Sequence, residues 1–364
     1  MTGSRRHARV AAALLAVAAA TAACAGDDGT TPVTPAPRIT SPATAPSTPA
    51  TTTTAATATA AAGVATTSDE PEAPLEFVDD RGETMTFDAP PRRVVAWEAL
   101  VPALVELGIE PVGVLALNEI AADPSFVEAG VDTEALTPVS TEFGEVDLDV
   151  LAALEPDLIL TSTVGGELFQ GFADSSTQEL AGRVAPFVVL DANADMMTGI
   201  ERVEQLAVLL GADLASAANR AGAAAFDEAV AGLEAAFAAK PGLTAAFGGS
   251  YADAGLFIAS AADYPELRFY ESLGLDVFDA PTDALITWEL VDGIDADVFL
   301  LDDRMTDEEL EALGGIAGWG AIPSIAAGQY STTWRFLVPF SRAQLARTIE
   351  RMLPTLQAAD PDVA

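Results

Sequence analysis

Two residue types that carry much of enzyme and metal chemistry occur once each in this chain of 364 residues. The single histidine, His7, and the single cysteine, Cys24, both precede the first aromatic residue, Phe77. One histidine and one cysteine, both near the N-terminus, are too few for a catalytic triad with histidine, a zinc site built from cysteine or a disulfide framework. The 55 Asp and Glu residues against 17 Lys and Arg give a net charge of −38, which opposes binding to nucleic acid because phosphates need clustered cations.

Cys24 ends a segment with the features of an export signal. Three arginines and no acidic residue stand in the first nine positions, and Val10–Ala20 is apolar but too short to span a membrane. The sequence Thr21-Ala22-Ala23-Cys24 resembles the lipobox of bacterial lipoproteins, which implies that the cysteine becomes lipidated. We therefore expect residues 1–23 to be a lipoprotein signal peptide, with the export route open. An ordinary signal peptide with an incidental cysteine is the alternative.

Residues 24–74 have the composition of a disordered tether. From residue 41 to residue 67 the chain uses only Ala, Thr, Pro, Ser, Gly and Val. Such a segment cannot bury enough apolar surface to offset the entropy of ordering it. As a flexible coil it would reach roughly 40 Å. With a lipid at Cys24, this predicts a protein exported from the cell and anchored to the outer face of its membrane.

The rest of the chain alternates short apolar runs with amphipathic stretches. This pattern predicts an α/β fold with mostly parallel sheets, because strands that are apolar throughout are covered on both faces. The expected strands are 93–96, 112–114, 158–160, 187–190, 245–247, 256–258, 275–278, 298–301 and 329–331. The expected short helices are 100–107, 148–154, 197–210, 265–273, 288–294, 307–313 and 340–353.

A longer helix interrupts this alternation at residues 213–239, which contain no proline. Its apolar residues Phe226, Val230, Leu233 and Phe237 share one face. Its length of roughly 40 Å suits a rod between two lobes. We therefore expect a first lobe at 75–212, an inter-lobe helix at 213–240 and a second lobe at 241–358.

Three blocks, in this order and spacing, carry a family resemblance. Residues 79–114 contain the strand RRVVAW and a helix that ends in LGIEPVGV, residues 147–163 contain a helix followed by PDLI, and residues 318–333 begin with GWGAIP. Together with the lipobox they resemble the iron-siderophore and cobalamin class of ABC-transporter substrate-binding proteins. The resemblance covers roughly residues 77–358.

This resemblance implies two α/β lobes joined by one long helix, with a ligand cleft between the lobes. It implies a protein, expected to be a monomer, that captures a ferric siderophore and delivers it to an ABC permease and its ATPase. It implies no enzyme activity, no bound metal of the protein's own and no cofactor besides the lipid on Cys24.

Ligands of open α/β sheets lie beyond the carboxyl ends of the strands. Ferric siderophores present apolar surfaces and anionic oxygens, which suit aromatic faces and arginine forks. The expected ligand-binding residues are Trp97, Glu98, Asn118, Thr163, Tyr251, Arg304, Trp334 and Arg335. The alternatives remain open: Trp97 as a core residue, and Arg304 paired with Asp302 or Asp303. We expect Trp319 to be core.

In related proteins a glutamate at each lobe tip pairs with arginine on the permease. By position, Glu289 matches the second-lobe glutamate, and Glu167 is the first-lobe choice with Glu179 in reserve. In a chain this acidic, the alternative for each is a solvated surface residue.

Three other functions compete with the capture of a ferric siderophore. A sister class binds bare zinc or manganese, which favour imidazole, and His7 is removed with the signal. Cobalamin or haem remains an alternative ligand for the same fold. A lipid-anchored enzyme is the alternative of a different class, but the chain contains no G-x-S-x-G and no P-loop.

Overall fold

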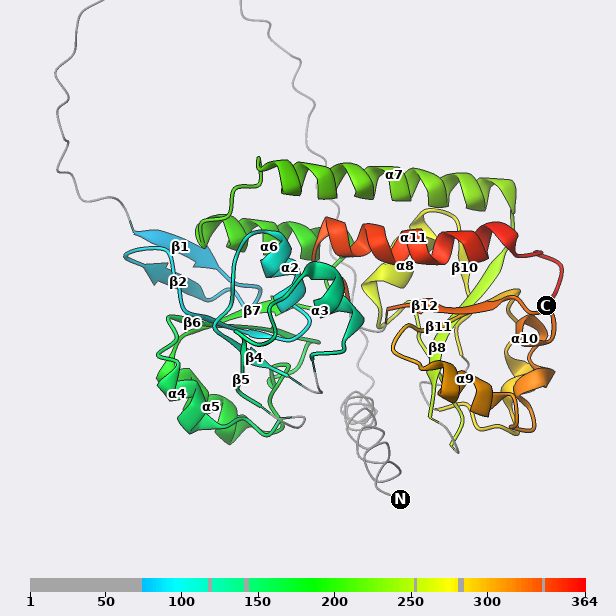
Figure 1. Ribbon diagram of the computed structural model, residues 1–364, viewed down its shortest axis with the longest axis horizontal. Helices are drawn as coiled ribbons and strands as arrows, with labels where there is room; N and C mark the ends of the chain where they lie inside the picture. Colours follow the sequence, from blue (N-terminus) through cyan, green and yellow to red (C-terminus); the bar gives the residue numbers. More distant parts are fainter. Residues whose placement is uncertain (1–73, 117–119, 141–143, 252–253, 281–284, 336–337) are drawn as a thin grey trace, which may run out of the picture.

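The computed structural model describes residues 74–116, 120–140, 144–251, 254–280, 285–335 and 338–364. Within these residues the chain forms two α/β lobes side by side, with long helices lying across both (Figure 1). Residues 1–73, which include the expected signal peptide, nearly all of the expected tether and Cys24, lie outside the described residues, as does Asn118. None of the described helices is long and apolar enough to cross a membrane.

The first lobe contains a five-stranded sheet, all parallel, in the order β5-β4-β3-β6-β7. Its strands are β3 (Val94–Trp97), β4 (Gly113–Leu115), β5 (Thr137–Pro138), β6 (Leu158–Thr163) and β7 (Phe187–Asp191). Successive strand residues point to opposite faces, so Val94 and Ala96 join one core cluster while Val95 joins another. The sheet is therefore covered on both faces, as the apolar strands predict.

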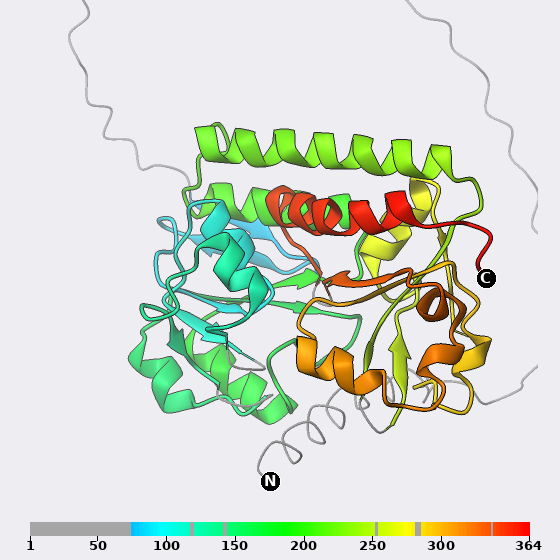
Figure 2. The same ribbon diagram turned by 45° about the vertical axis from the view of Figure 1, so that its right-hand side comes forward.

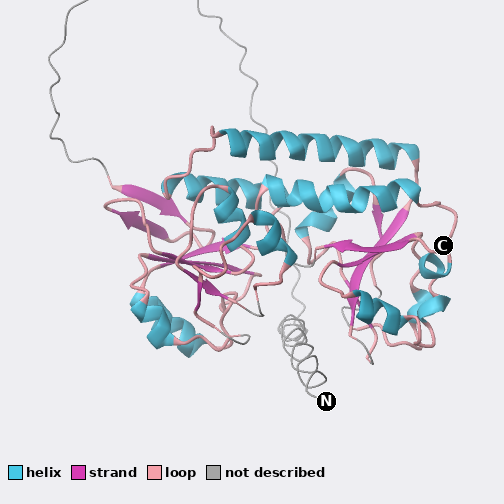
Figure 3. Cartoon of the chain, viewed as in Figure 1, coloured by secondary structure: helices cyan, strands magenta, loops and turns pink. Residues whose placement is uncertain are grey.

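Helices cover the two faces of this sheet unequally. Residues of α2 (Val101–Glu106), α3 (Pro124–Ala129) and α6 (Met196–Leu209) pack on one face. Residues of α4 (Leu148–Ala153) and α5 (Ser175–Val184) pack on the other. An antiparallel hairpin of β1 (Leu75–Val78) and β2 (Thr84–Phe87) lies against the first of these layers. Figure 3 shows the strands enclosed by these helices.

The second lobe contains a sheet in the order β10-β8-β11-β12, all parallel, with β9 antiparallel to β8. Its strands are β8 (Thr244–Ser250), β9 (Leu256–Ile258), β10 (Asp276–Val277), β11 (Val298–Asp302) and β12 (Tyr330–Trp334). Its helices are α8 (Pro265–Ser272), α9 (Asp307–Leu313), α10 (Pro323–Ala326) and α11 (Arg342–Ala358), with 3-10 turns η1 (Val291–Gly293) and η2 (Trp319–Ala321). Trp319 is buried in the core of this lobe, as expected.

Glycine allows β8 and β9 to approach closely. A Cβ atom at Gly248 would lie 2.0 Å from the backbone oxygen of Phe257, whereas one at the neighbouring Gly249 would meet nothing nearer than 3.6 Å. The close approach of these strands therefore depends on the missing side chain at Gly248.

The long helix α7 (Ala217–Ala239) runs from the first lobe to the second. It begins four residues later than the sequence pattern indicates, because the Ser216 side chain caps it by accepting a hydrogen bond from the Asn219 N–H at 3.1 Å. Phe226, Leu233 and Phe237 are buried on one face, as their spacing predicts. They pack into the core of the second lobe.

A second helix, α11, lies along α7 and runs in the same direction (Figures 1 and 2). Gly222 faces Ala343 and Gly232 faces Leu353, so the two helices stay in step over this length. Lys240, the only lysine in the chain, follows α7 and donates to the carbonyl oxygens of Leu356, Gln357 and Ala359. A cation at these unpaired carbonyls stabilises the end of α11. The lobes are thus joined by a pair of helices.

Besides α7, several other expected elements differ in the structure. The helix expected at 288–294 is wrong: only the 3-10 turn η1 forms there, after a turn in which Leu290 N–H donates to Thr287 O at 2.9 Å. Strand β12 continues to Trp334, because its threonines extend the β-rich run. Helix α11 continues through Pro354 to Ala358, since proline removes only one backbone donor.

Candidate functional site

The carboxyl ends of β3, β11 and β12 meet where the two lobes face each other. Trp97 ends β3, and its ring packs edge-on against Phe340 of the second lobe, with centroids 6.3 Å apart. Arg335 follows β12 and reaches Glu128 of α3 in the first lobe at 3.5 Å. We call this region the junction. It is the region where the strand-end rule places a ligand.

Six charged side chains cross the junction as one group, which we call the inter-lobe network: Glu106, Glu128, Asp303, Arg335, Arg347 and Arg351. The two glutamates come from α2 and α3 of the first lobe, and the other four residues come from the second. The network therefore ties the two lobes through charge as well as through the helix pair.

Asp303 is the most enclosed acid of the network. Its side chain is 7% exposed and accepts hydrogen bonds from Arg335, whose side chain is 6% exposed, at 2.6 Å and from Arg351 at 3.1 Å. Burial raises the pKa of Asp303, and the charges of Arg335 and Arg351 oppose this rise. Glu128 is shared by Arg335, Arg347 and Arg351. Each arginine of the network thus has a carboxylate partner.

Arg304 forms a separate, two-pronged pair with Asp302 at the end of β11. The distances are 3.0 Å from Nε to Oδ1 and 2.6 Å from Nη2 to Oδ2. Burial would lower the pKa of Arg304, but Asp302 raises it, with further contributions from Asp123 and Asp303. Asp123 caps α3 in the first lobe, so Arg304 faces that lobe across the junction. The pairing of Arg304 with Asp302 was one of the two alternatives open from sequence.

Tyr251 lies beside this pair. It follows β8 and is half-buried. Burial raises its pKa, while Arg304 opposes the rise and Asp302 adds to it. Since such effects act over short distances, the phenol and the Arg304–Asp302 pair share one local environment. Tyr251 and Arg304 are the expected ligand residues of the second lobe that keep exposed surface.

Trp334 and Arg335, in contrast, are buried. Trp334 is 0% exposed and packs against Phe247 and Tyr264, with ring centroids 6.1 Å and 5.6 Å apart. Beneath it lies Glu266, which is also buried. Burial raises the pKa of Glu266 to about 7. The indole of Trp334 and the charge of Arg268 lower this pKa, but their effect is smaller than that of burial. The structure therefore places Trp334 in the core that supports the junction.

The remaining expected ligand residues lie in the first lobe. Trp97 and Glu98 are buried at the end of β3. Thr163 ends β6, is half-buried, and donates its hydroxyl to Gly166 O at 2.9 Å. Asn118 is outside the described residues. Trp97 and Glu98 thus share the junction with the second-lobe residues, whereas Thr163 ends a neighbouring strand.

The sequence reasoning missed the acids and arginines that complete the junction: Glu106, Asp123, Glu128, Asp303, Arg347 and Arg351. Two signals were present. Asp123 precedes a proline, which is typical of a capped helix start. Arg347 and Arg351 are four residues apart on one helix, and so lie on one face.

Both glutamates expected to meet a permease are exposed, and apolar side chains flank them. Val164 is 40% and Leu168 38% exposed on either side of Glu167, and Leu290, next to Glu289, is 65% exposed. The reserve candidate, Glu179, is exposed and pairs with Arg183 at 2.6 Å. Both glutamates thus lie on the surface, beside apolar side chains that are also exposed.

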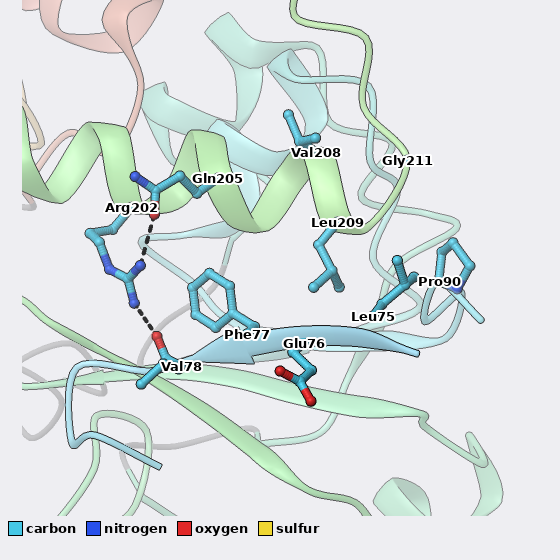
Figure 4. A pocket seen from close by; sticks show the side chains of 10 residues that line it. All are labelled: Leu75, Glu76, Phe77, Val78, Pro90, Arg202, Gln205, Val208, Leu209 and Gly211. Atoms are coloured by element: carbon cyan, nitrogen blue, oxygen red, sulfur yellow. Dashed lines mark hydrogen bonds between the residues drawn. The ribbon is translucent and has the colours of Figure 1, made fainter. Parts of the chain in front are cut away.

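A cavity of about 530 Å³ lies away from the junction, between the β1 strand and α6 (Figure 4). Arg202 lines it and donates to Gln205 at 2.8 Å and to the carbonyl of Val78. It contains none of the junction residues. In the described part of the chain, no group of three or more His, Cys, Asp or Glu residues could hold a metal ion.

Comparison with known proteins identifies the fold. No protein-family model matches the chain. No curated protein matches it either. Among solved structures, DesE, a ferric-siderophore receptor protein from Streptomyces coelicolor, is 25% identical, with a TM-score of 0.71 over 79% of this chain and 99% of that chain.

Two further solved structures share the fold. The siderophore periplasmic binding protein from the fuscachelin gene cluster of Thermobifida fusca is 22% identical, with a TM-score of 0.54 over 74% of this chain and 97% of that chain. FhuD from Vibrio cholerae, bound to Fe3+-Desferal, is 24% identical, with a TM-score of 0.52 over 73% and 98%. The two-lobed α/β fold that the sequence predicts is confirmed, and it is the fold of siderophore-binding proteins.

The shared acid of the inter-lobe network yields a prediction. Replacing Glu128 with glutamine should lower the free energy of unfolding by about 1–2 kcal/mol at low ionic strength, because three arginines lose a common counter-charge. Urea unfolding at low and high salt would measure this, and the loss should shrink in high salt. Glu179→Gln, in an exposed pair, is the control and should change stability by less than about 0.5 kcal/mol. Equal stability of both variants would contradict the role of Glu128.

The buried carboxyl of Glu266 yields a second prediction, on pH. Its folded-state pKa of about 7 exceeds its ordinary value of 4.5, so the folded state favours the protonated form. Stability from this group is complete below pH 4.5 and is lost as the pH rises through 7. Glu266→Gln should therefore be more stable than the natural protein at pH 8, by up to about 3 kcal/mol, and nearly equal to it at pH 4. Urea unfolding at both pH values tests this, and a constant difference between them would refute it.

Proposed function

We propose that this chain is an extracytoplasmic substrate-binding protein that captures a ferric siderophore and delivers it to an ABC importer. The observation that carries the proposal is the match to DesE, described as a ferric-siderophore receptor protein, over 99% of that chain with a TM-score of 0.71. Two other matched structures of the same fold are siderophore-binding proteins, one from Thermobifida fusca and the other FhuD from Vibrio cholerae, bound to Fe3+-Desferal. Two lobes that meet at strand ends suit a ligand enclosed between them.

The ligand, in this proposal, lies at the junction. Tyr251 and Arg304 offer exposed contact surface from the second lobe. Trp97 and Glu98 form the first-lobe side, with Asn118 and Thr163 as further contacts. Trp334 and Arg335 are buried and form the interior side of the site, with Trp334 packed among the rings of Phe247 and Tyr264. Side chains that packing already fixes lose little entropy when ligand binds.

The permease, in this proposal, docks on the surfaces around Glu167 and Glu289. Each carries an exposed carboxylate beside exposed apolar side chains. Apolar contact supplies area, while the charges orient the two proteins. One such surface on each lobe would let the permease sense both lobes at once.

The chain outside the lobes completes the proposal. A lipid on Cys24 anchors a monomer to the outer face of the membrane, and the tether lets it reach the permease and its ATPase. The proposed segments are a signal peptide at 1–23, a tether at 24–74, lobes at 75–212 and 241–358, and an inter-lobe helix at 213–240.

Ligand titration tests the proposed function. Ferric siderophores should quench the tryptophan fluorescence of the purified protein, because Trp97 and Trp334 lie at or beneath the junction. Tyr251→Ala should weaken binding about tenfold, through loss of aromatic contact. Val208→Ala, at an exposed position on α6, is the control and should bind normally. Quenching by cobalamin or haem alone would refute the siderophore assignment.

Uptake assays test the docking surfaces separately. The double variant Glu167→Ala, Glu289→Ala should lower siderophore uptake by about tenfold or more, because two interface charges lose their partners. Its affinity for ligand in solution should stay unchanged, since both residues are exposed and neither lies at the junction. Glu308→Ala, on the exposed start of α9, is the control. Normal uptake by the double variant would remove both glutamates from the docking surface.

A further inference from the structure

The arginines that cross or line the junction are already engaged in the structure. Arg304 pairs with Asp302, and the three arginines of the inter-lobe network pair with its acids. The guanidinium of Arg268 donates to backbone carbonyl oxygens, including that of Asn193 at 2.7 Å. Arg342 forms an ion pair with Glu204 at 2.9 Å. Among the described residues at the junction, no arginine stands apart from an acid or carbonyl partner.

Carboxylates outnumber guanidinium groups at this place. Four of these six arginines belong to the ion pairs of the junction itself: Arg304, Arg335, Arg347 and Arg351. Six acids surround them: Glu98, Glu106, Asp123, Glu128, Asp302 and Asp303. These carboxyl groups thus exceed the guanidinium groups by two, and the whole chain carries −38. The acids at the junction and the net negative charge of the whole chain both disfavour the binding of an anionic ligand.

A guanidinium has five N–H donors, so an anionic ligand could approach these arginines beside their present partners, but it would then lie close to the carboxyl groups that pair with them. Asp303, with a side chain 7% exposed, would have a second acid beside the guanidinium groups that it shares. Acids that crowd an anion in an enclosed site repel it and lower its affinity. The geometry thus favours a ligand that needs no arginine charge at all.

Ferric chelates differ in charge according to their donor groups. A hydroxamate carries one negative charge, so three of them around Fe³⁺ give a neutral centre, which is cationic overall if the chelator bears a free amine. A catecholate carries two, so three of them leave a triple anion. We propose that this protein selects neutral or cationic ferric hydroxamates over anionic catecholate chelates. The proposal rests on the proposed function and names the ligand class of that same site.

Three probes of known charge test the selection at pH 7: ferric desferrioxamine B (cationic), its N-acetyl derivative (neutral) and ferric enterobactin (anionic). Fluorescence quenching should give dissociation constants at least about a hundredfold lower for the two hydroxamates than for the catecholate. Raising the salt concentration should lower the association rate of the cationic chelate, because the acidic surface attracts it and salt screens this attraction. The association rate of the neutral chelate should not change.

A matched pair of variants tests the cause. Asp302→Asn removes the carboxylate charge that pairs with Arg304, and it should reduce the ratio of hydroxamate to catecholate affinity by about tenfold, since the excess of acids at the junction falls by one. Glu179→Gln removes the partner of Arg183 on distant α5 and should leave the preference unchanged. Catecholate binding as tight as hydroxamate binding, or an unchanged preference in Asp302→Asn, would overturn the inference. If no ferric chelate bound, the proposed function itself would fall.

Discussion

The structure depends on one constraint: arginine charge enclosed between two lobes must be met by carboxylates from both. Asp303 comes from the second lobe and Glu128 from the first, and both share Arg351. Removing an ion from water costs several kcal/mol unless its partner is close and fixed. The relative position of the lobes is therefore set by the need to keep these charges paired. The arrangement of the lobes in turn fixes how the strand ends face each other at the junction, and so where a ligand between them would lie.

Two helices reinforce this constraint mechanically. Helix α7 connects the lobes, and α11 lies along it, with glycines at 222 and 232 that allow close packing. The N-terminal part of α11 contacts the first lobe through Arg347 and Glu106, while its remaining length fills the core of the second. A movement of one lobe against the other must shear this pair and break ion pairs together. Such a hinge favours small adjustments over a wide opening.

Much of the fold could be predicted from local patterns, because apolar runs and capping residues act over a few positions. The strands at 94–97 and 298–302 and the helix through Phe226 and Phe237 follow from such signals. The site was harder, because its chemistry lies in pairs far apart in sequence: Arg351 and Glu128 are 223 positions apart. Arg335 and Arg304 were expected near the ligand as positive charges. The pairing of Arg304 with Asp302 was open from the sequence, but the pairing of Arg335 with Asp303 and Glu128 was not, and these carboxyl groups offset the arginine charge of the site.

Lys240 has a further consequence for how the molecule can be studied. It is the only lysine in the chain, and its ammonium group is held by carbonyls at the end of α11. A reagent that modifies side-chain amines can therefore react at one place only, and only while those hydrogen bonds are broken. The rate of that single modification would therefore measure how often the ends of α7 and α11 separate. Local opening of the helix pair could be followed in this way without introducing a label by mutation.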